Sequence, residues 1–304
     1  MSKSPPLFLG EPRLIEQGQF NNLKQVWLPR ETPRKDWNCV PLDEACGLSP
    51  WQMHRFLYHP FSPETPVRYN TDLQDFPKAP FFQLLGVLME GISGGGLKAT
   101  VKGNLPRNFC LTAAESFYGK SEKLSSHFGS ELTSEVIWDE LHTVRLTAGM
   151  AGLLRKTGGR FRMTRKGEKF LCAGMDGKLF LDLFRAYTWK FHWAYRDLYP
   201  EMDMVQTSFL VTLFFLQKFG DRARPVKFYE DLFVKIFPET MSEVPQNQYF
   251  TPEQETRHCY STRALRRFAA FFGFAELIET ATSFEIPKAI KKNPFLDYWI
   301  TFES

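Results

Sequence analysis

The stretch GLLRKTGGRFRMT, from Gly152 to Thr164, predicts a tight β-hairpin. Short strand-like runs lie on either side of Gly158 and Gly159, and adjacent glycines supply the positive φ angles that a two-residue hairpin turn requires. A helix is expected before the hairpin, from about Ser134, because apolar residues recur there at helical spacing. These apolar positions are Ile137, Leu141, Val144, Ala148 and Ala151. The expected local order is therefore helix, hairpin, and then a second helix that opens at Thr-x-Lys-Gly.

The second strand of this hairpin begins a seven-residue frame that occurs twice. LKATVKG (Leu97–Gly103) and FRMTRKG (Phe161–Gly167) share an apolar residue, a base, a Thr and a Lys-Gly pair, 64 positions apart. We expect residues 97–100 and 161–164 to be equivalent strands, each followed by a helix that begins within two residues of its Lys-Gly pair. The frame therefore predicts two copies of one structural element.

Helices are expected on both sides of the first copy. PFFQLLGVLMEG predicts a helix that stops at Gly91, and Thr100 is placed to cap a helix from about Val101 to Tyr118.

A third, looser copy lies near the end of the chain. STRALRRFAAFFG predicts a helix and AELIE predicts a strand, and a second, lysine-bearing strand is expected to return towards Asn293. Asn293 and Pro294 occupy the positions that Thr and the residue after it hold in the seven-residue frame. An element built three times favours one elongated body that is mainly α-helical with short β-hairpins.

Two resemblances support this architecture. GLLRKTGGRFRMTRKGEKFL resembles the wing segment of bacterial multiple-antibiotic-resistance-type regulators, commonly Gly-Leu, a basic hairpin and then Leu-Thr-x-x-Gly. GLSPWQMHRFLYHPF, LKATVKGNLPRNFC and the segments after them also resemble a group of uncharacterised bacterial proteins with the same arm and repeated winged-helix-like segments. The resemblances imply repeated winged-helix-like units, and they carry over no activity.

Proline usage suggests the domain limits. Twelve of the 20 prolines lie in the first 80 residues, which favours an irregular Pro-rich N-terminal arm over residues 1–78. One helix is expected within the arm, capped by Ser49, begun at Pro50 and stopped by Pro60. Residues 79–175 are expected to hold two winged-helix-like units, and residues 176–304 a helical region that ends in a third.

Composition is that of a folded soluble protein. Of the 304 residues, 43% are hydrophobic and 24% are charged. The five cysteines are odd in number and follow no apolar leader, which favours a reducing cytoplasm. The apolar run Phe209–Phe219 is too short for a membrane span and predicts a buried helix, so no membrane association is expected.

Motifs for catalysis and metal binding are weak. GISGG (Gly91–Gly95) matches G-x-S-x-G, but Ser93 would follow a helix, whereas a nucleophile elbow follows a strand. Cys39, Cys46, His54 and His59 are close in sequence, and their spacing departs from that of zinc sites. We therefore expect no catalytic residue, no cofactor and no metal, with zinc at these four residues kept as an alternative.

Basic residues are concentrated around the hairpin. From Arg145 to Lys169 there are eight bases and one acid, a net charge of +7 in a chain whose total is +4. A third-copy group at helical spacing is expected to share or flank one exposed face. The candidate nucleic-acid-binding residues are Arg155, Lys156, Arg160, Arg162, Arg165, Lys166, Lys169, Arg263, Arg266 and Arg267.

Three functional hypotheses follow. The first is a non-catalytic, winged-helix-repeat scaffold that binds an unidentified protein. The second is a regulator-like protein that binds duplex nucleic acid through the basic hairpin 153–169, although Asp139 and Glu140 on the expected reading helix would repel phosphates. The third is an enzyme that no motif reveals.

Overall fold

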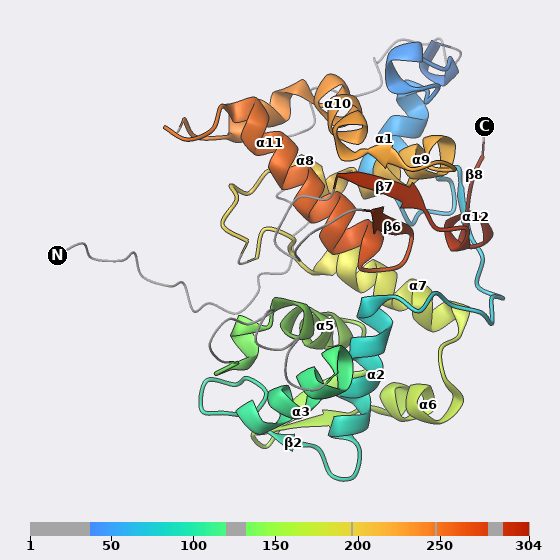
Figure 1. The fold of residues 1–304 in the computed structure, drawn as a ribbon. Helices are drawn as coiled ribbons and strands as arrows, with labels where there is room; N and C mark the ends of the chain where they lie inside the picture. The colour runs from blue at the N-terminus through green and yellow to red at the C-terminus, as the bar shows by residue number, and fades with distance from the viewer. Residues whose placement is uncertain (1–36, 120–131, 196, 247, 279–287, 304) are drawn as a thin grey trace.

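Two segments of the chain follow the same order of helices and strands in the computed structural model, which describes residues 37–119, 132–195, 197–246, 248–278 and 288–303. The first unit consists of α2 (Pro80–Ile92), β2 (Leu97–Lys98), α3 (Arg107–Tyr118), α5 (Asp139–Met150), β3 (Leu154–Thr157) and β4 (Arg160–Met163). The second consists of α9 (Phe209–Phe219), β5 (Arg224–Pro225), α10 (Val226–Ile236), α11 (Pro252–Tyr260) continued by the π-helical η7 (Ser261–Ala270), β6 (Ala275–Ile278) and β7 (Ala289–Lys292). The protein is mainly α-helical with small antiparallel sheets (Figure 1).

Each unit contains one three-stranded sheet with the same arrangement. The strand orders are β2-β4-β3 and β5-β7-β6, so the first strand of each unit pairs with the third. Backbone hydrogen bonds at the third helix and the hairpin also correspond. The Leu153 amide donates to the Ala148 carbonyl, as the Phe274 amide donates to that of Ala269. The Thr164 amide donates to the Leu153 carbonyl, as the Asn293 amide donates to the Phe274 carbonyl. This equivalence supports the sequence-based match of Thr164 with Asn293.

The two copies of the Thr-x-Lys-Gly frame are neighbours within the first sheet. Leu97 lies opposite Phe161, and Lys98 lies opposite Arg160. The frame predicts two copies of one structural element, but the two copies supply neighbouring strands of a single sheet. In the described part of residues 79–175 the strands form one three-stranded sheet, where two successive units were expected, and the third copy supplies β6 and β7 of the second unit.

The helix expected from Val101 begins later, at Arg107. Residues 100–104 form a turn instead, in which the Asn104 amide donates to Thr100 Oγ1 and Gly103 has a φ of 80°. Pro106, as the N-cap residue, fixes the helix start. After the second copy, α6 (Arg165–Ala173) begins where predicted.

Several local predictions are confirmed. The hairpin β3–β4 turns at Gly158 and Gly159, whose φ angles are 59° and 69°. Helix α1 (Pro50–Tyr58) has a capping box between Ser49 and Gln52, and α9 is buried along most of its length. The helix expected from about Ser134 is a short 3-10 turn, η4 (Glu135–Ile137), followed by α5. Residues 1–36 of the expected arm lie outside the described residues.

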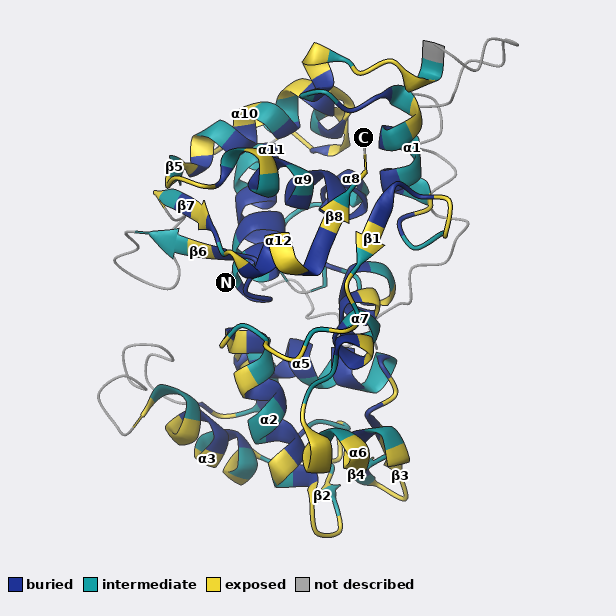
Figure 2. Ribbon diagram, turned by 90° about the vertical axis from the view of Figure 1, so that its right-hand side faces the viewer, coloured by how far each residue is buried: buried dark blue, intermediate teal, exposed yellow. Residues whose placement is uncertain are grey.

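The remaining elements join the units and border them. They are α7 (Gly177–Arg185), η5 (Ala186–Lys190), α8 (Asp203–Thr207), η6 (Pro238–Glu243), α12 (Phe295–Trp299), β1 (Val67–Tyr69), β8 (Ile300–Phe302), η2 (Trp37–Cys39) and η3 (Asp43–Ala45). Helix α7 lies between the two units in both ribbon views, with the first unit below and the second above (Figures 1 and 2). Strand β1 pairs antiparallel with β8, so segments far apart in the sequence form one ribbon.

Aromatic side chains make the core continuous from one unit to the other. Phe81 of α2 stacks on Phe272, which follows η7, with ring centroids 4.3 Å apart. Phe184 of α7 packs against Trp299 at 4.5 Å. The buried residues form one connected cluster, drawn in dark blue along the facing sides of the helices (Figure 2). Burial of so much apolar surface between the units favours their fixed association.

Among the described residues, no helix combines the length and the apolar character that a bilayer crossing requires.

Candidate functional site

The third helices of the two units meet beside a cleft of about 390 Å³, here named the interunit cleft. Every residue of α5 and of η7 is buried or half-buried. Aromatic side chains form much of the lining: Phe117, Tyr118, Tyr187, Phe191, Trp193 and Tyr195. Asp139 and Glu140 from α5 and three arginines from η7 supply the charged part. The volume is that of sites that hold a small molecule or one large side chain.

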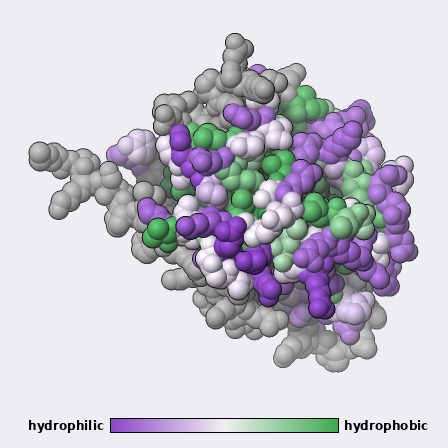
Figure 3. Space-filling model, turned by 90° about the horizontal axis from the view of Figure 1, so that it is seen from below, coloured by the Kyte–Doolittle hydropathy of each residue, from purple (hydrophilic) through white to green (hydrophobic). Residues whose placement is uncertain are grey.

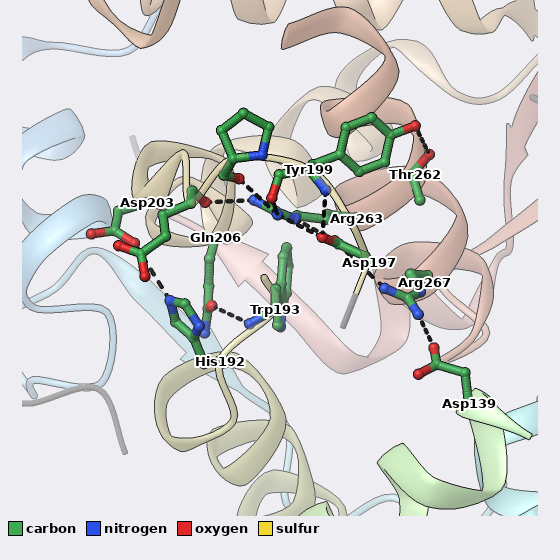
Figure 4. Close-up of polar contacts among 12 residues, drawn as sticks. Asp139, His192, Trp193, Asp197, Tyr199, Asp203, Gln206, Thr262, Arg263 and Arg267 are labelled. Carbon is green, nitrogen blue, oxygen red and sulfur yellow. Dashed lines mark hydrogen bonds and ion pairs between the residues drawn. The ribbon is translucent and has the colours of Figure 1, made fainter. Parts of the chain in front are cut away.

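Arg263, a predicted nucleic-acid contact, lies in the wall of this cleft rather than on an exposed face. Its side chain is 1% exposed, and it donates to both carboxylate oxygens of Asp197, at 2.6 and 2.8 Å. It also donates to the carbonyl oxygens of Glu201 and Pro200 (Figure 4). Burial opposes the charged form of Arg263, and the hydrogen bonds to Asp197 more than offset this, so its pKa is raised. Arg263 is therefore a structural residue, which corrects its assignment to an exposed basic face.

Arg267 connects the two units. Its guanidinium forms an ion pair with Asp139 at the start of α5, and its Nη1 lies 3.5 Å from Asp197 (Figure 4). The Tyr187 hydroxyl donates to the carbonyl oxygen of Arg267, and burial raises the pKa of that hydroxyl. Arg266, the third base of this group, is half-buried at the cleft. The three arginines therefore line an interface inside the molecule and do not form an exposed face.

A buried carboxylate fixes the start of α5 within the first unit. Glu135 is fully buried and accepts hydrogen bonds from His142 Nδ1 at 2.8 Å, from Arg145 Nε and from the Leu105 amide at 2.5 Å. Burial by itself would raise the pKa of Glu135, but His142 and Arg145 lower it overall. Arg145 also lies over the Phe161 ring. Arg145 thus contributes to the first unit's interior and not to the basic surface counted from the sequence.

Some of the hairpin bases are hydrogen-bonded to other parts of the first unit or to α7, and others are exposed. Arg160 donates to the carbonyl oxygens of Gly96, at 2.6 Å, and Gly95. Lys166 donates to the Ala151 carbonyl and to Asp182. Arg155, Lys156, Arg162 and Arg165 are exposed, and Lys169 has a long ion pair of 3.8 Å with Asp176.

Strand pairing adds bases that sequence reasoning missed. Lys98 lies opposite Arg160, so it stands beside the hairpin on the same sheet. Lys102 is in the turn next to Gly103, where an added Cβ would lie 2.8 Å from Lys156 Nζ. Three bases and no acid in residues 97–107 were the available signal. Because these bases are far from the hairpin in the sequence, the sequence alone did not group them with it.

The rejected motifs do not assemble into a catalytic or metal centre. Ser93 follows α2, and its hydroxyl donates to the Glu90 carbonyl, as in a helix end and not a nucleophile elbow. The rings of His54 and His59 lie 5.4 Å apart. Within the described part of the chain, no group of three or more His, Cys, Asp or Glu side chains is placed to hold a metal ion.

Comparison of the chain with protein-family models, with curated proteins and with solved structures found no match.

Proposed function

We propose that the chain is a non-catalytic scaffold of two winged-helix units that binds a protein partner at the interunit cleft. Helix, strand, helix, helix, strand, strand is the order of a winged helix, and each unit follows it with the same sheet order. This assignment takes residues 80–163 and 209–292 as the two units, in place of three. The single observation that supports the function is the burial of α5 and of η7, the second half of the other third helix.

A DNA-reading winged helix presents its third helix to the major groove. In this chain the third helices are α5 and the continuous α11–η7 pair. Helix α5 and η7 face the cleft, where Arg267 pairs with Asp139 between the units. Groove reading by either helix would require separation of this interface and exposure of the shared aromatic core. The geometry therefore favours a protein-binding use over sequence-specific DNA reading.

The lining of the cleft indicates the kind of segment that would fit. Tyr118, Phe191 and Tyr195 offer flat apolar surface with polar edges, and such side chains are enriched where proteins bind one another. Glu140 and the half-buried Arg266 supply charge of both signs at the cleft. We propose a partner segment that inserts one large apolar side chain flanked by charged residues.

Site-specific photocrosslinking tests this function. A photoreactive phenylalanine at Ile137, which lines the cleft and is 47% exposed, should crosslink to one protein in cells that express the chain naturally. The control position is Tyr298 on α12, which is 69% exposed and lies outside the cleft lining. Glu140→Trp should fill the rim and remove the adduct at Ile137 while the melting temperature stays close to that of the parent.

Two outcomes would reject the proposal. One is the same set of adducts at Ile137 and at Tyr298, which would indicate nonspecific contact. The other is enrichment of a defined duplex sequence from a random pool by the full-length protein, which would show that a third helix reads DNA despite its burial.

A further inference from the structure

We propose that the outer face of the first sheet binds the phosphate backbone of duplex nucleic acid without reading sequence. This site is separate from the interunit cleft. We name it the basic sheet face, and it consists of the strand residues Lys98, Arg155, Arg160 and Arg162 together with Lys102 in the turn after β2. It lies at the lower end of the molecule, away from the second unit (Figures 1 and 2). Seen from below, this end carries many strongly hydrophilic side chains (Figure 3).

The first observation is the pairing of like charges across the strands. Arg155 lies directly opposite Arg162, and Lys98 lies directly opposite Arg160. Side chains at such positions point to the same face with Cβ atoms about 5 Å apart, so both pairs repel. Within the described residues, none of these five bases forms an ion pair, and residues 97–104 and 154–163 contain no acid. An anion bound on this face would relieve the repulsion.

The second observation is the corresponding position in the second sheet. There Glu276 lies opposite Lys291, at the place that Arg155 and Arg162 occupy in the first sheet. The same strand order therefore forms with a balanced charge pair. Two opposed arginines are not a requirement of this sheet, which supports a role in binding an external anion.

The side chains on the face favour phosphates over a protein or an unpaired strand. Its outward strand positions are Lys98, Arg155, Thr157, Arg160 and Arg162, with no aromatic residue among them. Protein interfaces generally have an apolar or aromatic centre, and single-stranded nucleic acid is generally held by stacking on aromatic rings. Charge without stacking surface is typical of contacts to a duplex backbone. Arg160 is held against the Gly95 and Gly96 carbonyls, which fixes one cation in the middle of the face.

Fluorescence anisotropy of the full chain with two labelled DNA duplexes of unrelated sequence tests the proposal. The parent should bind both with equal affinity, and its log affinity should fall linearly with log salt between about 50 and 200 mM. Lys98→Ala/Lys102→Ala should flatten that slope by up to about 1.8, because each lost phosphate contact accounts for about 0.9. Arg155→Ala/Arg162→Ala should have an effect of the same size.

A matched control removes two exposed bases from other faces, as Lys178→Ala/Arg222→Ala, and should leave the slope unchanged. The Lys98 and Lys102 variant is decisive, because both residues lie outside the hairpin: Lys98 reaches it through strand pairing, and Lys102 lies in the turn that follows β2. No binding by the parent at low salt would overturn the proposal. So would a Lys98 and Lys102 variant that equals the control, tighter binding to an unpaired strand, or equal binding to polyglutamate.

Discussion

The two three-stranded sheets share a backbone plan and differ in charge. In the pair formed by the last two strands of each unit, the first sheet places Arg155 opposite Arg162, and the second sheet places Glu276 opposite Lys291 at the same position. Like charges in direct opposition destabilise a sheet, and opposite charges stabilise it. The strand order therefore does not determine the charges on the sheet. The first unit exposes Arg155 and Arg162 on its sheet, whereas Arg263 of the second unit is buried.

The largest effect is expected where an arginine is buried. Arg263→Met should leave the Asp197 carboxylate without its bidentate partner and lower the free energy of unfolding by about 3–5 kcal/mol. Arg162→Met, the same change on the first sheet, should alter it by less than about 0.5 kcal/mol. Urea unfolding followed by circular dichroism measures both. Equal effects of the two substitutions would break the distinction between a structural and a surface arginine.

Each unit also has a buried glutamate, and these should respond differently to acid. Glu135 bonds two basic side chains, whereas Glu230 accepts a hydrogen bond from the Ser261 hydroxyl. Glu135→Gln should cost about 2–3 kcal/mol at neutral pH, because hydrogen bonds to a charged group are lost. Glu230→Gln should cost less, since its partner is neutral.

The pH dependence gives the sign of this effect. Because the pKa of Glu135 is lowered in the folded state, its contribution is fully present above the unfolded pKa and is lost as the pH falls through the folded value. The difference in unfolding free energy between the parent and Glu135→Gln should therefore shrink as the pH is lowered from 7 towards 3. A difference that grows on acidification would contradict this assignment.

Glycines before the first strand of each unit should tolerate no side chain. Gly96 has a φ of 82°, and an added Cβ would lie 2.2 Å from the Phe161 carbonyl oxygen. Gly96→Ala should destabilise the protein by about 1–3 kcal/mol. Gly220→Ala should also destabilise it, because the added Cβ would lie 2.4 Å from the Leu216 carbonyl oxygen and 2.7 Å from Lys292 Cβ, but without the cost of a positive φ. Gly86→Ala in α2 is the control and should stabilise slightly, since nothing lies within 4 Å of its added Cβ.

The smallest effect is expected from an exchange of charge between the sheets. Arg155→Glu should stabilise the first sheet by about 0.2–1 kcal/mol, and Glu276→Arg should destabilise the second by a similar amount. Both effects should decrease in high salt, because the pairs are exposed. Thermal unfolding at two salt concentrations measures them. Effects of the opposite sign would show that the cross-strand charges do not interact as the register implies.

Local features of the fold could be predicted from the sequence because their causes are local. Gly158 and Gly159 specify the hairpin turn, and Ser49 with Pro50 specifies the start of α1. The predicted mainly α-helical chain with short β-hairpins is confirmed at that level. The match of Thr164 with Asn293 also came from residue type alone.

The long-range arrangement could not be predicted in the same way. A repeated frame indicates similar strands, but it does not say whether they belong to two sheets or pair within one, as Leu97 and Phe161 do. Helical spacing placed Arg263, Arg266 and Arg267 near one another without showing which side faced Asp197. The interunit cleft depends on contacts between residues more than 100 positions apart, such as Asp139 and Arg267.

The ribbon of β1 and β8 has a consequence for synthesis of the chain. Arg68 and Glu303 form an ion pair across it although 235 positions separate them. Strand β1 therefore leaves the ribosome long before its pairing partner exists, and its edge stays open while the two units are being made. Exposed strand edges are sites of wrong association between chains. Demand for a chaperone should be greatest during this interval and should end when Ile300–Phe302 emerges.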